Sequence, residues 1–142
     1  DGEDVTEAIR HPRVSSQVSQ VAAHLPVRKE LLKAQRILAS QGGVVMDGRD
    51  IGTFVLPNAP FKFFLTASLA TRSKRRFLEL KTKGIEVSLE EVEKEIKQRD
   101  FLDENRNCAP LVAAPDAEII DTTTLTVEEV VEKITNRYWG RA

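Results

Sequence analysis

Short apolar runs alternate along this chain with longer segments whose apolar residues recur at helical spacing. The apolar runs occupy residues 44–46, 61–65 and 117–120. Strands that are joined through helices pair in parallel, with right-handed crossovers. A nearly continuous apolar run such as 61–65 is typical of a strand that is covered on both faces, as in a parallel sheet. The alternation therefore predicts an α/β fold in which helices flank a short parallel sheet.

The ends of the helical segments carry recognisable signals. Pro12 suits a first helical turn, and Pro26 interrupts the apolar stripe that follows, so we expect one helix to end there and a second to continue to Gly42. Ser88 and Glu91 have the spacing of a capping box. Three short strands are few for this much helix, and we expect the sheet to lack an edge. The helices are expected over 12–25, 27–41, 66–83, 88–100 and from 126 onward.

Composition restricts the class of partner. Of the 142 residues, 41% are hydrophobic and 30% are charged, which is the balance of a globular protein of one domain. The formal net charge of -1 predicts neither a nucleic-acid nor a membrane binder, and no apolar run approaches the roughly 20 residues that span a bilayer. Cys108 is the only cysteine, which excludes an internal disulfide and fits a reducing compartment. We expect the cytoplasm, and the acidic start of the chain is unlike a secretory signal.

A charged loop follows the first apolar run. In this loop Asp47 and Asp50 flank Arg49. Gly48 and Gly52 allow the backbone to turn and to approach a ligand closely. Ligands of α/β proteins bind at the carboxyl ends of the strands, so the loop is a candidate site for recognising an anion or the polar edge of a ligand. A surface turn in which an aspartate and the arginine satisfy one another explains the same spacing equally well.

Two further groups of charges are rich in arginine. One lies over 72–76 and the other over 97–106. The planar fork of arginine suits phosphate oxygens. If both groups face the loop at Arg49, a phosphorylated ligand accounts for cations that would otherwise repel each other, whereas a solvated helix surface is the alternative for each group alone. No Cys or His spacing fits a metal site and no histidine is close in sequence to Cys108, so we expect neither a metal ligand set nor a cysteine nucleophile.

Four segments together resemble the bacterial cytidylate kinase family. They are residues 19–28, 47–60, 98–111 and 121–126, and the likeness extends over nearly the whole chain. The resemblance implies a partial P-loop NTPase-like fold of the nucleoside monophosphate kinase type. It also implies that the parent enzyme transfers the γ-phosphoryl group of ATP to CMP or dCMP, giving CDP or dCDP, with ATP and Mg²⁺ as cofactors. Such a transfer depends on positioning and charge neutralisation, which suits a site rich in arginine.

The resemblance assigns a role to each matching residue. Ser19, Arg28 and Asp50 would read the cytosine edge, and Asp50 would reject uracil because it accepts a hydrogen bond from the cytosine amino group. Asp103 would contact the sugar. The remaining assignments concern phosphates: Arg49, Arg99 and Arg106 hold the phosphate of the acceptor, and Arg72 and Arg76 contact those of ATP from the lid.

The same resemblance divides the chain into regions. Residues 1–43 are expected to form the helical part of the CMP-binding region, and 44–66 and 111–142 the core strands and helices. Residues 67–110 would form the lid with its flanking helices, and the polar segment 84–110 is expected to act as a mobile flap.

The chain departs from the family at the phosphate loop. No stretch has the form glycine, four residues, glycine, lysine, then serine or threonine, which cradles the phosphates of ATP and supplies a hydroxyl ligand to Mg²⁺. We therefore expect the C-terminal portion of such a kinase, inactive or nearly so on its own, and a monomer when complete. Two alternatives stay open: a nucleotide-binding or structural module without catalysis, and a kinase for another nucleoside monophosphate such as UMP.

Overall fold

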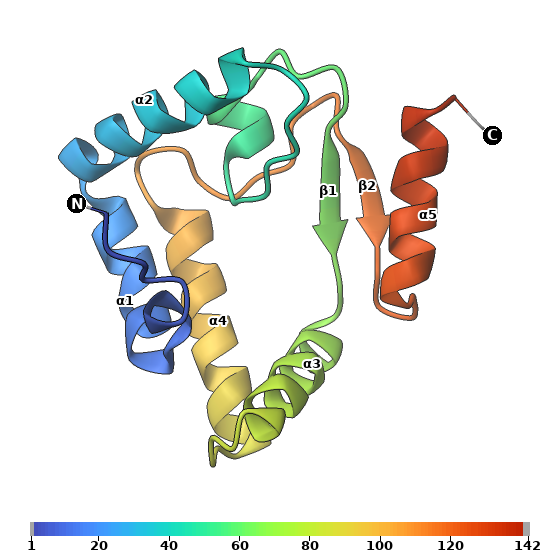
Figure 1. Cartoon of the computed structure of the whole chain (residues 1–142). Coiled ribbons are helices and arrows are strands. Elements are labelled where there is room, and N and C mark those ends of the chain that lie inside the picture. The colour runs from blue at the N-terminus through green and yellow to red at the C-terminus, as the bar shows by residue number, and fades with distance from the viewer. Residues whose placement is uncertain (1, 141–142) are drawn as a thin grey trace.

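A two-stranded sheet and five α-helices make up the regular structure in the described part of the chain (Figure 1). This computed structural model describes residues 2–140, except the side chains of Pro12, Ser15, Ser16, Ser19 and Ala23. The predicted α/β class, with a short parallel sheet flanked by helices, is confirmed. In chain order the elements are the 3₁₀-helix η1 (Ala8–Arg10), α1 (Pro12–Ala23), α2 (Leu25–Ser40), the π-helix η2 (Ile51–Val55), β1 (Phe63–Thr66), α3 (Leu69–Thr82), α4 (Leu89–Asn105), β2 (Glu118–Asp121) and α5 (Val127–Tyr138).

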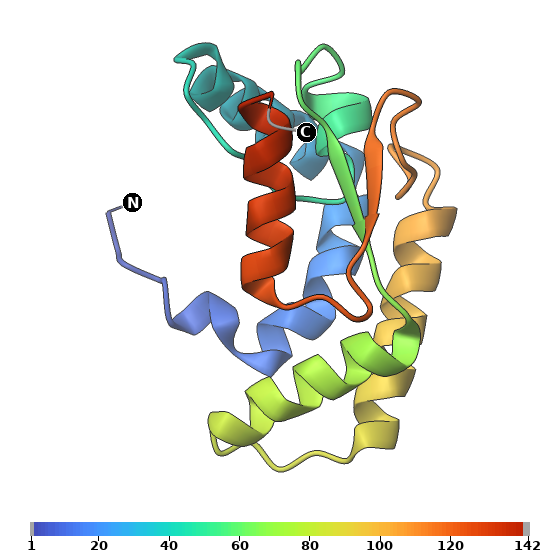
Figure 2. The same cartoon turned by 90° about the vertical axis from the view of Figure 1, so that its right-hand side faces the viewer.

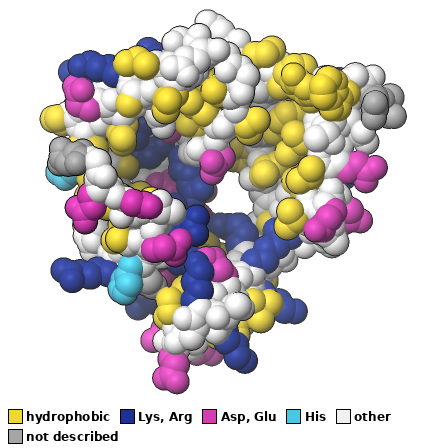
Figure 3. Space-filling view, in the orientation of Figure 1, with side chains coloured by type: hydrophobic (Ala, Val, Ile, Leu, Met, Phe, Trp, Pro, Cys, Tyr) yellow, Lys and Arg dark blue, Asp and Glu magenta, His cyan; other side chains and the backbone are white. Residues whose placement is uncertain are grey.

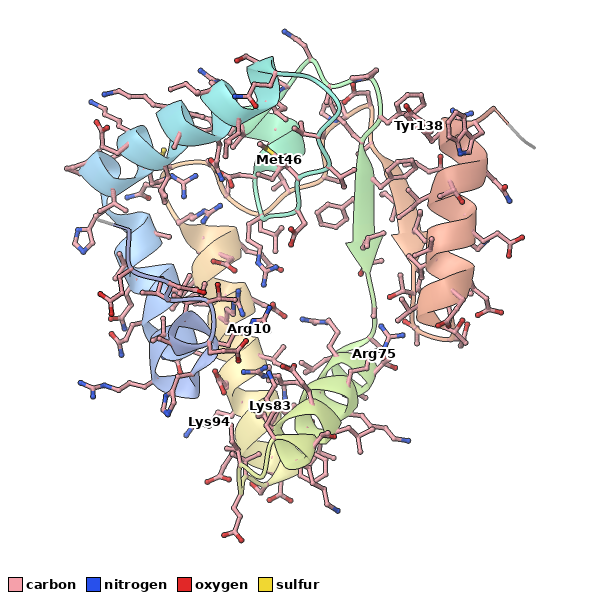
Figure 4. All side chains as sticks on the ribbon, in the orientation of Figure 1. Arg10, Met46, Arg75, Lys83, Lys94 and Tyr138 are labelled. Carbon is pink, nitrogen blue, oxygen red and sulfur yellow. The ribbon has the colours of Figure 1, made fainter. Side chains whose placement is uncertain are left out.

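The sheet consists of β1 and β2, which pair in parallel with Phe63 opposite Glu118. Each strand is shifted by one or two residues from its predicted run. The predicted strand over 44–46 is wrong: these residues form no ladder, and Val45 is fully exposed, at 101%. A strand is stable only beside a hydrogen-bonded neighbour, and none pairs with this segment among residues 2–140. Met46, the last residue of the segment 44–46, is labelled in Figure 4.

The prediction that the strand over 61–65 is covered on both faces is also wrong, and the second strand is partly exposed as well. Leu65 of β1 is 51% exposed and Ile119 of β2 is 65% exposed, although their neighbour Ile120 is buried. Helix α5 lies beside β2 in Figure 1, and in Figure 2 it runs in roughly the same direction as the two strands. An ion pair of 3.1 Å between Arg137 Nε and Glu118 Oε2 links the helix to this strand. A groove of 450 Å³ remains between β2 and α5, and Ile119 lies along it, so the sheet is only partly covered.

The helix ends follow local capping signals in most places. The predicted capping box forms at Ser88 and Glu91, and Thr126, where the last helix is expected to begin, is the N-cap of α5. The break between α1 and α2 falls at His24 rather than at Pro26, because a proline is tolerated in the first turn of a helix, where its missing N–H costs no hydrogen bond. Helix α4 runs to Asn105, five residues beyond the predicted end.

The chain exposes more surface than a closed domain of its size. Its accessible surface is 10812 Å², whereas a folded monomer of 15.9 kDa exposes about 7,400 Å². Figure 3 shows the reason, a hollow through the middle of the molecule with Lys and Arg side chains along its rim. No helix within residues 2–140 is long and apolar enough to cross a membrane. The buried apolar side chains are Val55, Leu80, Val92, Ala114 and Ile120.

Candidate functional site

A pocket of 270 Å³ opens between α1, α2, the charged loop and α4. The charged residues of the loop lie just before η2. A second set of charged residues lies at the C-terminal end of α4, which extends beyond its predicted end, and it faces the same pocket. The pocket therefore gathers side chains that are far apart in the sequence. Six of the predicted site residues line it: Arg28, Arg49, Asp50, Arg99, Asp103 and Arg106.

One wall of the pocket is built on an ion pair between Arg28 and Asp50. Arg28 lies in the first turns of α2 and donates from Nη2 to Asp50 Oδ2, and both side chains are largely buried. Its Nη1 also donates to the carbonyl oxygen of Ala22 at 3.2 Å. The guanidinium carbon lies 5.9 Å from the ring centroid of Phe54, within cation–π range. This arginine is held in one orientation by three different contacts.

The opposite wall is organised around Asp103, which is buried on α4. Arg49 donates from Nε to Asp103 Oδ2 at 3.0 Å. Arg99, four residues earlier on the helix, places its Nε 3.8 Å from the same oxygen, and Arg106 places Nη1 4.0 Å from Oδ1. A single carboxylate therefore faces three guanidinium groups, so the positive charge around it is only partly neutralised.

Two buried donors in the pocket have no hydrogen-bond partner in the described part of the chain. They are Arg28 Nε and Arg106 Nη2. The nearest carboxylate oxygen recorded for Arg106 Nη2 is Asp50 Oδ1, at 3.8 Å, which is too long for a hydrogen bond. Arg106 itself is fixed by its Nε, which donates to the carbonyl oxygen of Ala109 at 2.6 Å. A buried N–H without an acceptor costs about 1–3 kcal/mol, so both donors favour a ligand that brings acceptors.

The electrostatics of the pocket favour an anion. Burial, and then the neighbouring positive charge of Arg49, lowers the pKa of the Arg99 guanidinium. Burial, and then Arg28, lowers the pKa of Arg106. In both cases the aspartates of the pocket offset the shift only in part. An anionic ligand would relieve the repulsion between these guanidinium groups.

Among the described side chains, Arg72 and Arg76 are the two predicted site residues that do not line the pocket. The side chain of Ser19 is outside the described ones, although its backbone belongs to α1. Arg72 on α3 pairs with Asp100 of α4 at 2.6 Å, and Arg76 pairs with Glu79 on its own helix at 2.8 Å. The role of Arg72 and Arg76 toward ATP stays a prediction.

Sequence reasoning missed two residues beside the predicted ones. Phe54 lies against Arg28, and Arg36 of α2 donates to the backbone of η2. A signal for Arg36 was present, because it lies eight residues after Arg28 and residues with that spacing share a helix face.

The described residues do not supply a cage for the implied metal ion. Among them, no group of three or more His, Cys, Asp or Glu side chains is arranged to hold a metal. The described residues therefore do not fit Mg²⁺.

Comparison with known proteins gives consistent matches. A sequence model described as cytidylate kinase matches residues 1–139. The cytidylate kinase of Caldicellulosiruptor saccharolyticus is 55% identical over 139 residues, which are 98% of this chain and 62% of that protein. Those of Caldanaerobacter subterraneus and Bacillus licheniformis are each 58% identical, over 94% of this chain and 60% and 59% of their own lengths. The chain spans about 60% of the length of these curated relatives.

Proposed function

Because this chain belongs to the cytidylate kinase family, we propose that the pocket between α2 and α4 binds the phosphoryl acceptor CMP or dCMP. In the whole protein the γ-phosphoryl group of ATP would be transferred to this acceptor. The observation that carries the proposal is the convergence of Arg28, Asp50 and Arg106 with two buried N–H donors left without acceptors.

The Arg28–Asp50 pair has the chemistry to read a cytosine edge. Cytosine presents a carbonyl oxygen and a ring nitrogen as acceptors next to an amino group that donates. Arg28 keeps its Nε available as a donor, and the Asp50 carboxylate can accept from the amino group. Uracil presents a carbonyl oxygen in place of the amino group, which would face a carboxylate and leave it unpaired. The pair therefore selects cytosine through the cost of that unpaired group.

The arginines around Asp103 have the chemistry to hold the phosphate of the acceptor. Arg49 and Arg99 have exposed side chains and approach Asp103 through Nε, so their terminal nitrogens are available to a dianion. Arg106 adds the buried Nη2 from the same side. Guanidinium forks bind phosphate oxygens in pairs. In a transfer reaction these groups would also neutralise the charge that develops on the phosphoryl group.

The remaining parts of the reaction are proposed for the whole protein. ATP is the phosphoryl donor, Mg²⁺ accompanies its phosphates, and Arg72 and Arg76 on α3 face them. The working form is a monomer in the cytoplasm, which suits a chain whose only cysteine is Cys108. On this chain, the described side chains act by binding and orienting the acceptor and by neutralising its charge.

Calorimetric titration of the chain with CMP, UMP and AMP tests the proposal. We expect CMP to bind at least about tenfold more tightly than UMP, the equivalent of one lost hydrogen bond to a charged group. AMP should bind more weakly than CMP, because its base does not match the spacing of Arg28 and Asp50. Equal affinity for CMP and UMP would favour a kinase for another monophosphate, and no binding of any nucleotide would favour a structural module.

A further inference from the structure

The charged loop continues into a single turn of π-helix. In η2 the Val55 amide donates to the carbonyl oxygen of Asp50 at 3.2 Å, and the Leu56 amide donates to that of Ile51 at 2.7 Å. These are the i→i+5 bonds of a π-turn, which is rare and recurs at functional sites. The turn begins directly after Asp50, so its geometry decides where the Asp50 carboxylate points.

Arg36 holds the far end of this turn. Its Nε donates to the carbonyl oxygen of Val55 at 3.1 Å, and its Nη2 donates to that of Phe54 at 2.9 Å. The last carbonyls of a helical turn have no partner within the helix and carry partial negative charge. A guanidinium fork satisfies two of them at once, which a water molecule or a lysine cannot do with the same geometry.

The two ends of the turn are therefore held by the same helix. Arg28 of α2 pairs with Asp50 at the start, and Arg36 of α2 binds the carbonyls at the end. The two arginines lie eight residues apart, on one helix face. We infer that Arg36 is a positioning residue: it touches no ligand, since it lies outside the pocket lining, and it fixes the turn that orients Asp50 toward the pyrimidine amino group. This inference rests on the proposed function.

Removing Arg36 is expected to affect recognition of the base selectively. Without the guanidinium group of Arg36, the carbonyl oxygens of Phe54 and Val55 accept hydrogen bonds from water instead, and the π-turn becomes less rigid. The ion pair between Arg28 and Asp50 remains. The Asp50 carboxylate then points less consistently at the amino group that only cytosine carries. The affinity for CMP falls, and the affinity for UMP, which makes no bond to Asp50, does not.

The ligand test compares Arg36→Ala with Lys33→Ala in the chain. Lys33 is an exposed residue of the same helix that pairs only with Glu30 in the contacts recorded for it, at 2.7 Å. The CMP-to-UMP affinity ratio, measured by calorimetry, should fall roughly fivefold to tenfold in Arg36→Ala and stay unchanged in Lys33→Ala. An equal loss of affinity for both nucleotides, or no loss for either, would overturn the positioning role.

A second measurement needs no nucleotide and separates this inference from the proposed function. The amides of Phe54, Val55 and Leu56 close the π-turn, so their hydrogen exchange should accelerate at least about tenfold in Arg36→Ala. Unchanged exchange overturns the positioning role even where CMP binds. Where the unaltered chain binds no CMP, the proposed function fails and the exchange rates alone decide whether Arg36 holds the turn.

Arg36→Lys provides the conservative variant. Lysine keeps the positive charge, but its ammonium group lacks the planar fork that binds two carbonyl oxygens at once. We expect this variant to fold, to lose part of the discrimination between CMP and UMP, and to show intermediate hydrogen-exchange rates. If Arg36→Ala does not fold, Arg36→Lys carries the test. If Arg36→Lys has the same CMP-to-UMP affinity ratio and the same amide exchange rates as the unaltered chain, a positive charge alone is sufficient. That result would overturn the role assigned to the guanidinium group of Arg36.

Discussion

Around the pocket charged side chains are buried, whereas on the sheet apolar side chains are exposed. The side chains of Arg106 and Asp103 are 9% and 5% exposed. On the sheet Ile119 is 65% exposed, and Val127 at the start of the neighbouring helix is 75% exposed. The two regions belong to the same chain, yet each reverses the usual distribution of charge and apolar surface.

The pocket and the sheet depend on different interactions for their structure. Buried charges are tolerated only with partners, so the pocket depends on specific ion pairs carried by α2, the charged loop and α4. The exposed apolar side chains of β1 and β2 gain little from folding, because they stay in contact with water. Nucleotide binding should therefore respond strongly to changes in the ion pairs and weakly to changes at the exposed residues of the sheet.

The largest effect is expected from Asp50→Ala. This change leaves Arg28 buried without a carboxylate and next to Arg106, and breaking a buried ion pair costs about 3–5 kcal/mol of unfolding free energy. It also removes the acceptor for the cytosine amino group, so CMP affinity should fall by at least about a hundredfold. Urea unfolding and calorimetric titration measure the two effects.

Glu30→Ala is the matched control, because Glu30 forms an exposed ion pair with Lys33 on the same helix. Exposed pairs contribute under about 1 kcal/mol, and the control should bind CMP normally. CMP binding that survives Asp50→Ala would show that Asp50 takes no part in base recognition and that binding does not depend on the Arg28–Asp50 ion pair.

A matched pair of leucines compares buried and exposed apolar positions directly. Leu80 on α3 is buried, and Leu65 on β1 is half-exposed. Leu80→Ala should cost about 2–5 kcal/mol, and Leu65→Ala under about 1 kcal/mol, since only the first leaves a cavity. Chemical denaturation of both variants gives the comparison. Similar losses would show that β1 is packed more tightly in solution than its exposure indicates.

Acid should weaken the helix that carries Arg99 and Asp103. The backbone N–H of Ser88, and then its side chain, lowers the pKa of Glu91 from its ordinary value of 4.5. The pKa of Glu91 is lower in the folded than in the unfolded chain, so the stability from this group is complete above the ordinary value and is lost as the pH falls through the lowered value.

Glu91→Gln isolates this contribution. The glutamine amide can still accept the hydrogen bond of the capping box but does not titrate. The Tm advantage of the unaltered chain over the variant should therefore shrink between about pH 6 and about pH 3. A constant difference in Tm over this range would mean that other carboxylates govern the response to acid.

The elements that were predictable are those whose signals are local. The capping box of α4 depends on Ser88 and Glu91, two residues three apart, and it forms as the sequence indicates. The strand over 44–46 was wrong because a strand requires a partner, and a short apolar run contains no information about whether that partner is present. The apolar stripes of α1 and α2 fix helical periodicity but not burial: Leu31 and Ile37 on α2 stay exposed.

The site shows the same division. The residues grouped by the family resemblance, such as Arg28, Asp50 and Asp103, line one pocket, and their roles stay predictions. The spacing between Arg28 and Arg36 places both on one helix face, but the partners of Arg36 are backbone carbonyls, which every residue has, so the sequence did not indicate its contacts. The π-turn was equally hidden, since its i→i+5 bonds depend on how α2 packs against the loop rather than on local propensity.

The smallest effect on stability, and the clearest test of the sheet, is expected from Ile119→Thr. Threonine keeps the β-branched shape that strands favour, so the free energy of unfolding should change by less than about 1 kcal/mol. The side chain of Ile119 is exposed in the groove between β2 and α5, and exposed apolar surface of this kind can associate with other chains. Sedimentation velocity should show that any self-association of the unaltered chain begins at a higher concentration in the variant, with CMP affinity unchanged. A fall in CMP affinity in this variant would show that the pocket depends on the sheet, and the two regions would then not be independent.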